Sequence, residues 1–349
     1  MTSTLICYII ILNTLLYKAL IFAQTIPKEV KGDFDMLLLA ILILFAILII
    51  TVSYFCYRLA FFAPKRVEDV EYRLPHGEQY DQRRSGIQKS IDEMLSRPFE
   101  PVTITSHDGK KLYARYYHVA DHAPLQILFH GYKSSAVLDL CGGSHLAGKL
   151  GQNALVVDQR SHGKSEGASI TFGVEERKDC LSWINYARSR FGDDVKIILS
   201  GLSMGAATVL MAADLELPDN VVGIMADCPY SSPKAIICKV CKDMHLPPKL
   251  FYPFIRLGAF LFGHFDLEES SAASAVQHTK IPILLIHGED DRFVPCDMSR
   301  EIHKACASNI RFETIPEAGH GLCYMVSPER YEEATTQFIQ QVLSEGVES

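Results

Sequence analysis

Short hydrophobic runs alternate with longer amphipathic stretches along the chain from about residue 101 onward. Runs of strand length, bounded by residues that favour turns, predict eight strands. These strands are expected at Val102–Thr105, Leu112–His118, Gln126–His130, Ala154–Asp158, Lys196–Ser200, Val221–Ala226, Ile283–His287 and Arg311–Ile315. Helical periodicity between the later runs predicts helices near Val137–Leu150, Val174–Phe191, Ser203–Leu215, Met298–Ala307 and Pro328–Leu343.

The order of these elements indicates an α/β fold. Strands that alternate with helices form a mostly parallel central sheet with helices on both faces. The first two strands are close in sequence, with Asp108-Gly109 just before the second, so we expect them to form an antiparallel hairpin. Residues 101–349 are therefore predicted to form one domain.

One long insertion interrupts the alternation. More than fifty residues separate the strand ending at Ala226 from the strand beginning at Ile283, whereas a whole βαβ unit needs only about 30. The excess predicts a small helical cap at about residues 231–279. Its aromatic residues either line an acyl pocket or pack on the core.

The amino-terminal 57 residues contain two long apolar segments in place of the alternating pattern. Residues 36–57 contain no charged residue and are long enough to cross a bilayer as a helix. Residues 1–35 include a second apolar segment, Leu5 to Ala23, compatible with another span or a signal-like region. Residues 58–100 are expected to be a linker with one helix near Ser85–Ser96. Basic residues after the span favour a single- or double-pass membrane protein with its catalytic domain in the cytoplasm.

Composition excludes several classes of function. The net charge of −7, without a Lys- or Arg-rich run, argues against a nucleic-acid partner. Two of the ten cysteines fall in apolar amino-terminal segments, and the other eight are scattered through a domain large enough to build its own core, so no disulfide framework is expected. Cys238 and Cys241 form a CxxC without a second such pair, which favours free thiols in a helix over a zinc site. Since the histidines lack a metal-binding spacing as well, we expect no metal and no cofactor.

Ser203 is the predicted nucleophile. The segment Gly201–Gly205 reads GLSMG, which is a G-x-S-x-G motif between a predicted strand and a predicted helix. A sharp strand-to-helix turn exposes the serine hydroxyl, and the small flanking residues relieve crowding of the backbone. The turn also aims the positive end of the helix at a developing oxyanion.

His320 is the predicted general base. A serine hydroxyl is a weak nucleophile until a base takes its proton. His320 lies in a loop after the last predicted strand, at the strand end where such folds place their chemistry. The chain order of serine, acid and histidine agrees with this role.

The acid that orients the histidine is less well defined. The segment that follows the strand Ile283–His287 supplies Glu289, Asp290 and Asp291. One carboxylate must hold the imidazole tautomer and stabilise its charged form. Spacing alone does not choose between Asp290 and Asp291, and Asp227 at the end of an earlier strand is a third candidate.

An oxyanion hole requires two backbone N–H donors. The amide of Met204, next to the nucleophile, is the first predicted donor. The second is the amide of Tyr132, in the loop after the strand Gln126–His130, where Gly131 permits a tight backbone. His130 is expected to organise this loop and not to take part in the chemistry.

Taken together, these residues resemble the α/β-hydrolase superfamily, in particular its serine aminopeptidase S33-like and membrane-anchored branches. The resemblance covers roughly Val102 to Val342. It rests on His130-Gly131, the loop Asp158–Gly167, GLSMG, HGEDDRFVP and Gly319-His320. In similar proteins the acid lies two positions before a hydrophobic-Val-Pro segment, and this implies Asp291. Ser161 departs from the glycine that relatives carry in the loop Asp158–Gly167, which is structural.

The sequence therefore predicts a membrane-anchored serine hydrolase that cleaves an acyl ester or thioester. Its expected partners are the membrane and a small-molecule or lipid-like acyl substrate. Two alternatives remain open, an S33-type peptidase and a catalytically silent scaffold that binds a lipid or a protein. The sequence does not specify an oligomeric state.

Overall fold

The computed structural model describes residues 28–63 and 77–344. The apolar segment Leu5 to Ala23, expected to be a second span or a signal-like region, lies outside the described residues. Contacts divide the chain into two units, Met1–Cys56 and Tyr57–Ser349.

The first unit contains most of one long helix. Helix α2 (Lys28–Ala60) continues into the first residues of the second unit. Its residues Asp35–Ala60 are long and apolar enough to cross a membrane, and few of them are buried in the structure. The predicted span 36–57 lies within this segment.

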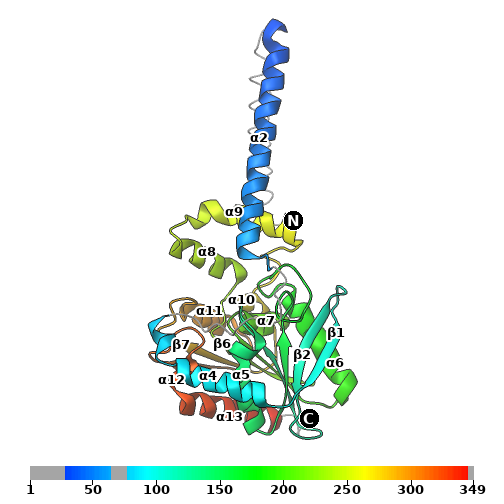
Figure 1. Ribbon diagram of the computed structural model, residues 1–349, viewed down its shortest axis with the longest axis vertical. Coiled ribbons are helices and arrows are strands. Elements are labelled where there is room, and N and C mark those ends of the chain that lie inside the picture. The colour runs from blue at the N-terminus through cyan, green and yellow to red at the C-terminus, as the bar shows by residue number, and fades with distance from the viewer. Residues whose placement is uncertain (1–27, 64–76, 345–349) are drawn as a thin grey trace. The chain divides into compact units, whose positions relative to one another are not determined.

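The second unit is built around a central sheet (Figure 1). The strands are β1 (Glu100–Thr105), β2 (Lys111–Tyr117), β3 (Leu125–Phe129), β4 (Asn153–Asp158), β5 (Ile197–Leu202), β6 (Val221–Asp227), β7 (Ile283–Gly288) and β8 (Ile310–Ile315). Within the described residues they form an eight-stranded sheet in the order β1-β2-β4-β3-β5-β6-β7-β8. The predicted hairpin β1–β2 is antiparallel, β2 also pairs antiparallel with β4, and every other pairing is parallel.

Helices account for most of the remaining chain. They are α3 (Glu78–Asp81), α4 (Arg84–Ser96), α5 (Ala136–Lys149), α6 (Glu176–Phe191), α7 (Met204–Ala212), α8 (Pro233–Asp243), α9 (Pro248–Gly258), the π-helix η1 (Ala259–Gly263), α10 (Ala272–Ala275), α11 (Asp297–Ala305), α12 (Cys323–Val326) and α13 (Pro328–Ser344). The five helices predicted between the later strands are all present, with ends that differ by at most three residues.

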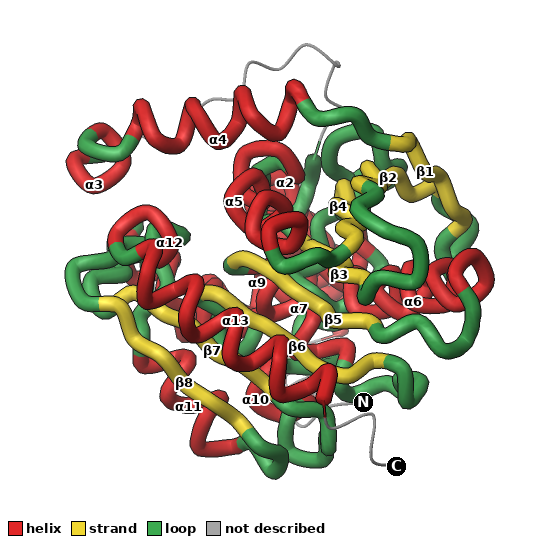
Figure 2. Tube along the Cα trace, turned by 90° about the horizontal axis from the view of Figure 1, so that it is seen from below, coloured by secondary structure: helices red, strands yellow, loops and turns green. Residues whose placement is uncertain are grey.

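Helices cover both faces of the sheet, as the pattern predicted (Figure 2). A side chain at Gly223 of β6 would meet Phe338 of α13, whereas one at Gly201 of β5 would meet the backbone of α7. Gly201 pairs with Ala226, which is three residues from Gly223, so the two glycines face opposite sides of the sheet. Helices α13 and α7 therefore lie on opposite faces. Strands β3, β4 and β7 are buried along their whole length. This explains why they read as continuous apolar runs.

Helix α4 belongs to the domain core although it lies in the region expected to be a linker. Ile87, Ile91 and Met94 are buried and pack with residues of α5 and β3. Their spacing of three and four residues forms one face of a helix.

The insertion between β6 and β7 is helical. Ser232 caps α8 by accepting a hydrogen bond from the Ala235 amide, and Pro233 occupies its first turn. Tyr252 and Phe265 are buried, and Phe265 packs edge-on against Phe61 with ring centroids 5.3 Å apart. Packing on the core, one of the two alternatives for the aromatic residues of the cap, therefore applies to these two.

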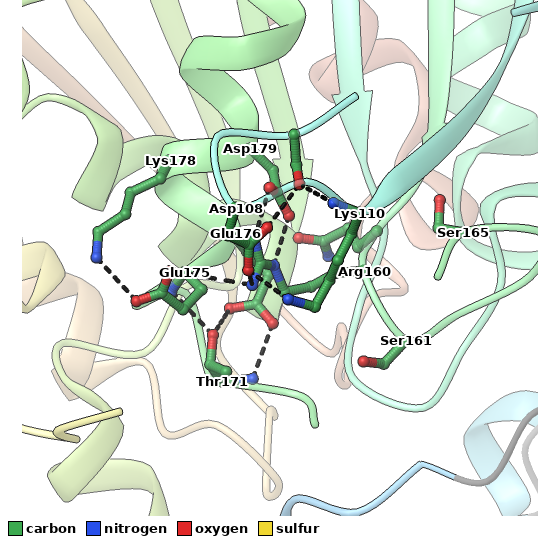
Figure 3. A network of polar contacts seen from close by, with 12 residues as sticks. Asp108, Lys110, Arg160, Ser161, Ser165, Thr171, Glu175, Glu176, Lys178 and Asp179 are labelled. Atoms are coloured by element: carbon green, nitrogen blue, oxygen red, sulfur yellow. Dashed lines mark hydrogen bonds and ion pairs between the residues drawn. The ribbon is translucent and has the colours of Figure 1, made fainter. Parts of the chain in front are cut away.

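A buried ion-pair network fixes the loop after β4 (Figure 3). The Arg160 guanidinium donates to both carboxylate oxygens of Asp179 on α6, at 2.6 and 2.7 Å. It also reaches both oxygens of Asp108, in the β1–β2 turn, at 3.2 and 3.4 Å. Arg160 and Asp179 are each 3% exposed. The network ties the loop to α6 and to the hairpin.

Replacement of Arg160 should destabilise the domain strongly. Arg160→Met leaves the buried Asp179 carboxylate without its main partner, and such losses cost about 3–5 kcal/mol. Denaturant unfolding of the detergent-solubilised chain measures this change. Arg190→Met is the matched control, because its pair with the half-exposed Glu100 is worth about 1 kcal/mol or less. Equal losses for the two variants would contradict the importance of the buried network.

Candidate functional site

Ser203 lies on a sharp turn between β5 and α7, as predicted. Its backbone has φ 56° and ψ −114°, a strained conformation for a residue with a side chain. Its amide donates to the carbonyl of Asp227 at the end of β6, at 2.8 Å. The neighbouring strand therefore helps to hold the turn in this conformation.

Two glycines make this turn feasible. A Cβ at Gly205 would lie 2.0 Å from the Phe129 carbonyl oxygen, and one at Gly201 would lie 2.3 Å from Gly205. Either atom would overlap the backbone. The G-x-S-x-G pattern is therefore required by the close approach of α7 to β3 and β5.

His320 contacts the serine directly. Its Nε2 is 2.8 Å from Ser203 Oγ, and its Nδ1 is 2.6 Å from Asp291 Oδ2. An ionised carboxylate only accepts hydrogen bonds, so Nδ1 carries the proton and Nε2 accepts from the serine hydroxyl. The Phe293 ring packs edge-on against the imidazole, with centroids 5.1 Å apart. The structure thus joins a hydroxyl, an imidazole and a carboxylate in one hydrogen-bonded chain.

Asp291, and not Asp290, is the carboxylate beside His320. Its second oxygen, Oδ1, accepts from the amides of Phe293 and Val294, at 2.9 and 2.8 Å. His287 Nε2 lies 3.4 Å from Oδ2. Asp290 is exposed at the surface of the same loop. The loop therefore turns one of two adjacent aspartates inward and the other outward.

The two buried aspartates near His320 have opposite pKa shifts. Burial alone would raise the pKa of Asp291, but the hydrogen bonds from His287 and His320 outweigh it and hold this pKa well below its usual range. Burial raises the pKa of Asp227 to about 6, an effect that the nearby His287 only partly offsets. Asp227 Oδ1 has no hydrogen-bond partner among the described residues. Asp291 is therefore the better stabilised anion.

The loop after β3 comes close to the serine. A Cβ at Gly131 would lie 3.4 Å from Ser203 Cβ and 2.9 Å from an Asp139 oxygen. Asp139 accepts from the Gly131 amide at 2.7 Å and from the Ser134 hydroxyl at 2.5 Å. The amides of Gly131, Lys133 and Ser134 all have acceptors. Within residues 28–63 and 77–344, the Tyr132 amide donates no hydrogen bond.

The other predicted donor is the amide of Met204, the first residue of α7. The first amides of a helix have no acceptor within that helix. The Met204 amide thus directly follows Ser203 in the chain, and the Tyr132 amide directly follows Gly131, which lies close to Ser203.

Hydrogen bonds of two histidines fix the loop after β3. His130 Nδ1 donates to the Gly131 carbonyl, and its Nε2 accepts from the Gln159 amide at 3.1 Å. His162 Nε2 accepts from the Lys133 amide at 3.1 Å, while its Nδ1 donates to the Arg160 carbonyl. The loop Asp158–Gly167, fixed by the Arg160 network, thus supports the backbone on both sides of Tyr132.

Three further hydrogen bonds at the site have no signal in the sequence pattern. The Tyr80 hydroxyl, on α3, donates to the His320 carbonyl at 2.7 Å. The Tyr132 hydroxyl donates to the Ala60 carbonyl at 2.7 Å, and Lys133 Nζ donates to the Leu59 carbonyl at 3.1 Å. The loop carrying the candidate oxyanion donor is therefore bonded to the last turn of α2.

Possible metal ligands occur together at two places in the described residues. Ligand atoms of Cys228, Asp291 and His320 lie within 4.8 Å of one another, as do those of His107, Asp108 and Asp179. In the first group His320 and Asp291 are bonded to each other, and in the second both aspartates bond Arg160. Each group thus already has a role that needs no ion.

Curated relatives resemble the chain at low identity. The chain is 25% identical over 229 residues to the uncharacterised protein YqkD of Bacillus subtilis, covering 65% of this chain and 75% of that protein. It is 26% identical over 171 residues to the uncharacterised protein YfhR of Escherichia coli K12, covering 48% of this chain. The chain therefore spans about half the length, 53%, of the Escherichia protein.

Solved structures share the fold. The esterase Pf2001 of Pyrococcus furiosus matches with a TM-score of 0.61 and 22% identity, over 80% of this chain and 98% of that chain. Est1E of Butyrivibrio proteoclasticus, solved with ferulic acid bound, matches with a TM-score of 0.54 and 22% identity, over 70% and 99%. The narrower likeness to S33 aminopeptidases stays a prediction. A model of the alpha/beta hydrolase family matches residues 126–334, more than half of the sequence and including Ser203, Asp291 and His320, so this chain belongs to that family.

Proposed function

We propose that this chain is a membrane-anchored serine hydrolase that cleaves an acyl ester or thioester. The observation that carries the proposal is the hydrogen-bonded chain from Asp291 through His320 to Ser203. The three side chains are those of a nucleophile, a general base and an orienting carboxylate, and the serine lies on a turn that exposes its oxygen.

In the first step, Ser203 Oγ attacks the acyl carbonyl carbon while His320 Nε2 takes the hydroxyl proton. The imidazolium then gives this proton to the departing alcohol or thiol, whose bond to the carbonyl carbon breaks, and an acyl-enzyme forms. Asp291 holds the Nδ1 tautomer and stabilises the imidazolium. Its lowered pKa keeps it ionised throughout the neutral range.

In the second step, water attacks the acyl carbonyl and gives its proton to His320. The bond to Ser203 Oγ breaks, the carboxylic acid leaves, and the serine recovers its proton. In both steps the amides of Tyr132 and Met204 donate to the oxygen that becomes negative. The support of His162 and Asp139 beneath the first of these amides limits reorganisation during the reaction.

The anchor bears on the substrate class. Helix α2 as a membrane span raises the local concentration of acyl lipids or acylated membrane proteins around the site. The described cysteines are all free thiols, in keeping with a cytoplasmic domain. The solved relatives include an esterase, but at 22% identity they support the fold, so ester chemistry here rests on the site itself.

An activity-based fluorophosphonate probe tests the nucleophile. The probe should label the parent chain, and Ser203→Ala should abolish labelling and lower ester turnover on the order of 10⁴-fold or more. Ser90→Ala, a half-buried serine of α4 without a contact to the site, is the matched control and should be labelled like the parent. Undiminished labelling of Ser203→Ala would refute the proposed nucleophile, and an unlabelled parent chain would favour a silent scaffold.

A substrate panel separates the esterase from the peptidase. The detergent-solubilised chain should hydrolyse short p-nitrophenyl esters and thioesters, whereas aminoacyl p-nitroanilides should remain uncleaved. The release of nitrophenol, thiol or nitroaniline is followed spectroscopically. Preferential cleavage of the anilides would favour the S33-type alternative.

The two buried aspartates should differ in their effect on turnover. Asp291→Asn keeps the shape of the side chain but supports the wrong tautomer of His320, so we expect kcat to fall by about 10⁴-fold. Asp227→Asn should change kcat by less than about 10-fold, because Asp227 makes no hydrogen bond to His320. Ester hydrolysis measures both variants, and a reversed order would make Asp227 the orienting acid.

Asp227 should also make stability depend on pH. Its pKa is about 6 in the folded chain, against an ordinary value of about 3.9. The folded state therefore binds a proton that the unfolded state releases between these values, and stability falls as pH rises through this window. Asp227→Asn removes the effect. Relative to the parent, the variant should gain up to about 3 kcal/mol between pH 4 and pH 7.

Denaturant unfolding at these two pH values measures that gain. Asp291 titrates in both proteins, so its contribution cancels when the unfolding free energy of the parent is subtracted from that of the variant. A constant difference between variant and parent across the window would show that Asp227 is ionised at its ordinary pKa.

A further inference from the structure

The helix formed by α9 and η1 is apolar almost all the way round. Residues Pro248–Gly263 read PKLFYPFIRLGAFLFG, with Lys249 and Arg256 as the charged side chains. Tyr252, Ile255 and Ala259 are buried against the domain. A helix with a second apolar face is normally covered on that face as well.

The outer face of this helix carries large exposed side chains. Leu250, Phe260 and Leu261 are 57%, 59% and 40% exposed. The positive charge of Arg256 is compensated, because its guanidinium forms ion pairs with Asp266 and Glu268 in the segment after η1. Several large apolar side chains exposed on one helix are typical of an interaction site.

The same helix adjoins the residues where α2 enters the second unit. The rings of Phe262 and Tyr57 lie 5.9 Å apart, and a Cβ at Gly263 would lie 3.3 Å from the Tyr57 ring. Leu59, two residues further along the chain, is 65% exposed. Leu59 thus belongs both to the second unit and to the segment that is apolar enough to cross a membrane.

We propose that the outer face of α9–η1, together with Leu59, lies on the surface of the lipid bilayer. Covalent continuity selects the occupant, since the segment that is apolar enough to cross a membrane ends at Ala60, and Tyr57 in its last turn contacts Phe262 of η1. Large apolar side chains with basic neighbours are typical of helices that lie in the membrane interface. Lys249 lies in the first turn of α9, and Arg58 precedes Leu59 in the chain, where each would meet anionic headgroups.

This inference rests on membrane anchoring by α2 and not on the hydrolase chemistry. The proposed surface gives the chain a second contact with the bilayer besides the span. That contact restricts rotation of the α/β domain relative to the membrane. Since the cap belongs to the same surface, the cap faces the lipid and not the bulk solvent.

Tryptophan emission in nanodiscs tests the proposal. The native chain contains one tryptophan, Trp183, which is fully buried on α6 and supplies a constant background. Phe260→Trp is made in the full chain and reconstituted with ordinary or brominated phosphatidylcholine. Brominated lipid should remove most of the added emission, and aqueous acrylamide should remove little of it. Leu261→Trp is a second variant on the same face.

Leu95→Trp is the matched control. Leu95 is 44% exposed on α4, at the opposite end of the domain from α9, so acrylamide and not brominated lipid should quench it (Figure 1). Unchanged Trp183 emission reports that each variant is folded.

Three results would overturn the proposal. Quenching of the residue 260 probe by acrylamide alone would mean a solvent-exposed cap, and protection from both quenchers would mean a protein partner such as a second copy. Failure of the chain to remain with the discs would remove the anchor itself. Fluorophosphonate labelling of Ser203 in the same samples reports on the hydrolase separately, so the two proposals fail independently.

Discussion

The close approach of α7 to β3 is the constraint on which the site depends. Gly205 lies so near the Phe129 carbonyl that no side chain fits between them. This contact sets the height of the turn above the sheet, and hence the position of Ser203 between the loop after β3 and the loop of His320. The strain at Ser203 persists because strands on both sides hold the turn. Stable parts of the core thus maintain a geometry that an isolated turn would relax.

Much of this architecture could be predicted from the sequence because it follows local rules. Buried parallel strands read as apolar runs, and each of the eight predicted strands lies within two residues of an observed one. Ser203 could be identified since its motif is dictated by backbone crowding, and His320 from its place after the last strand. The choice between Asp290 and Asp291 could not be made this way. It depends on which carboxylate accepts the amides of Phe293 and Val294, and periodicity carries no information about that.

Contacts between distant parts of the chain escaped prediction for the same reason. Tyr80 bonds the carbonyl of a residue 240 positions away, and nothing in its own neighbourhood distinguishes it from other surface tyrosines. Residues 58–100 read as a polar linker, yet Ile87, Ile91 and Met94 fill part of the core. Short helices in polar surroundings contribute to a domain through a few side chains, and such sparse patterns are hard to separate from loops.

The bonds from Tyr132 and Lys133 to the carbonyls of Ala60 and Leu59 bear on where the enzyme begins. A version trimmed to residue 101, where the α/β pattern starts, would retain Ser203, Asp291 and His320. It would nevertheless lose the carbonyls that hold the Tyr132 and Lys133 side chains, together with the Phe61 ring wedged against Phe265. A version beginning at Tyr57 would keep all three. In this chain the last turn of α2 is also the first part of the α/β domain.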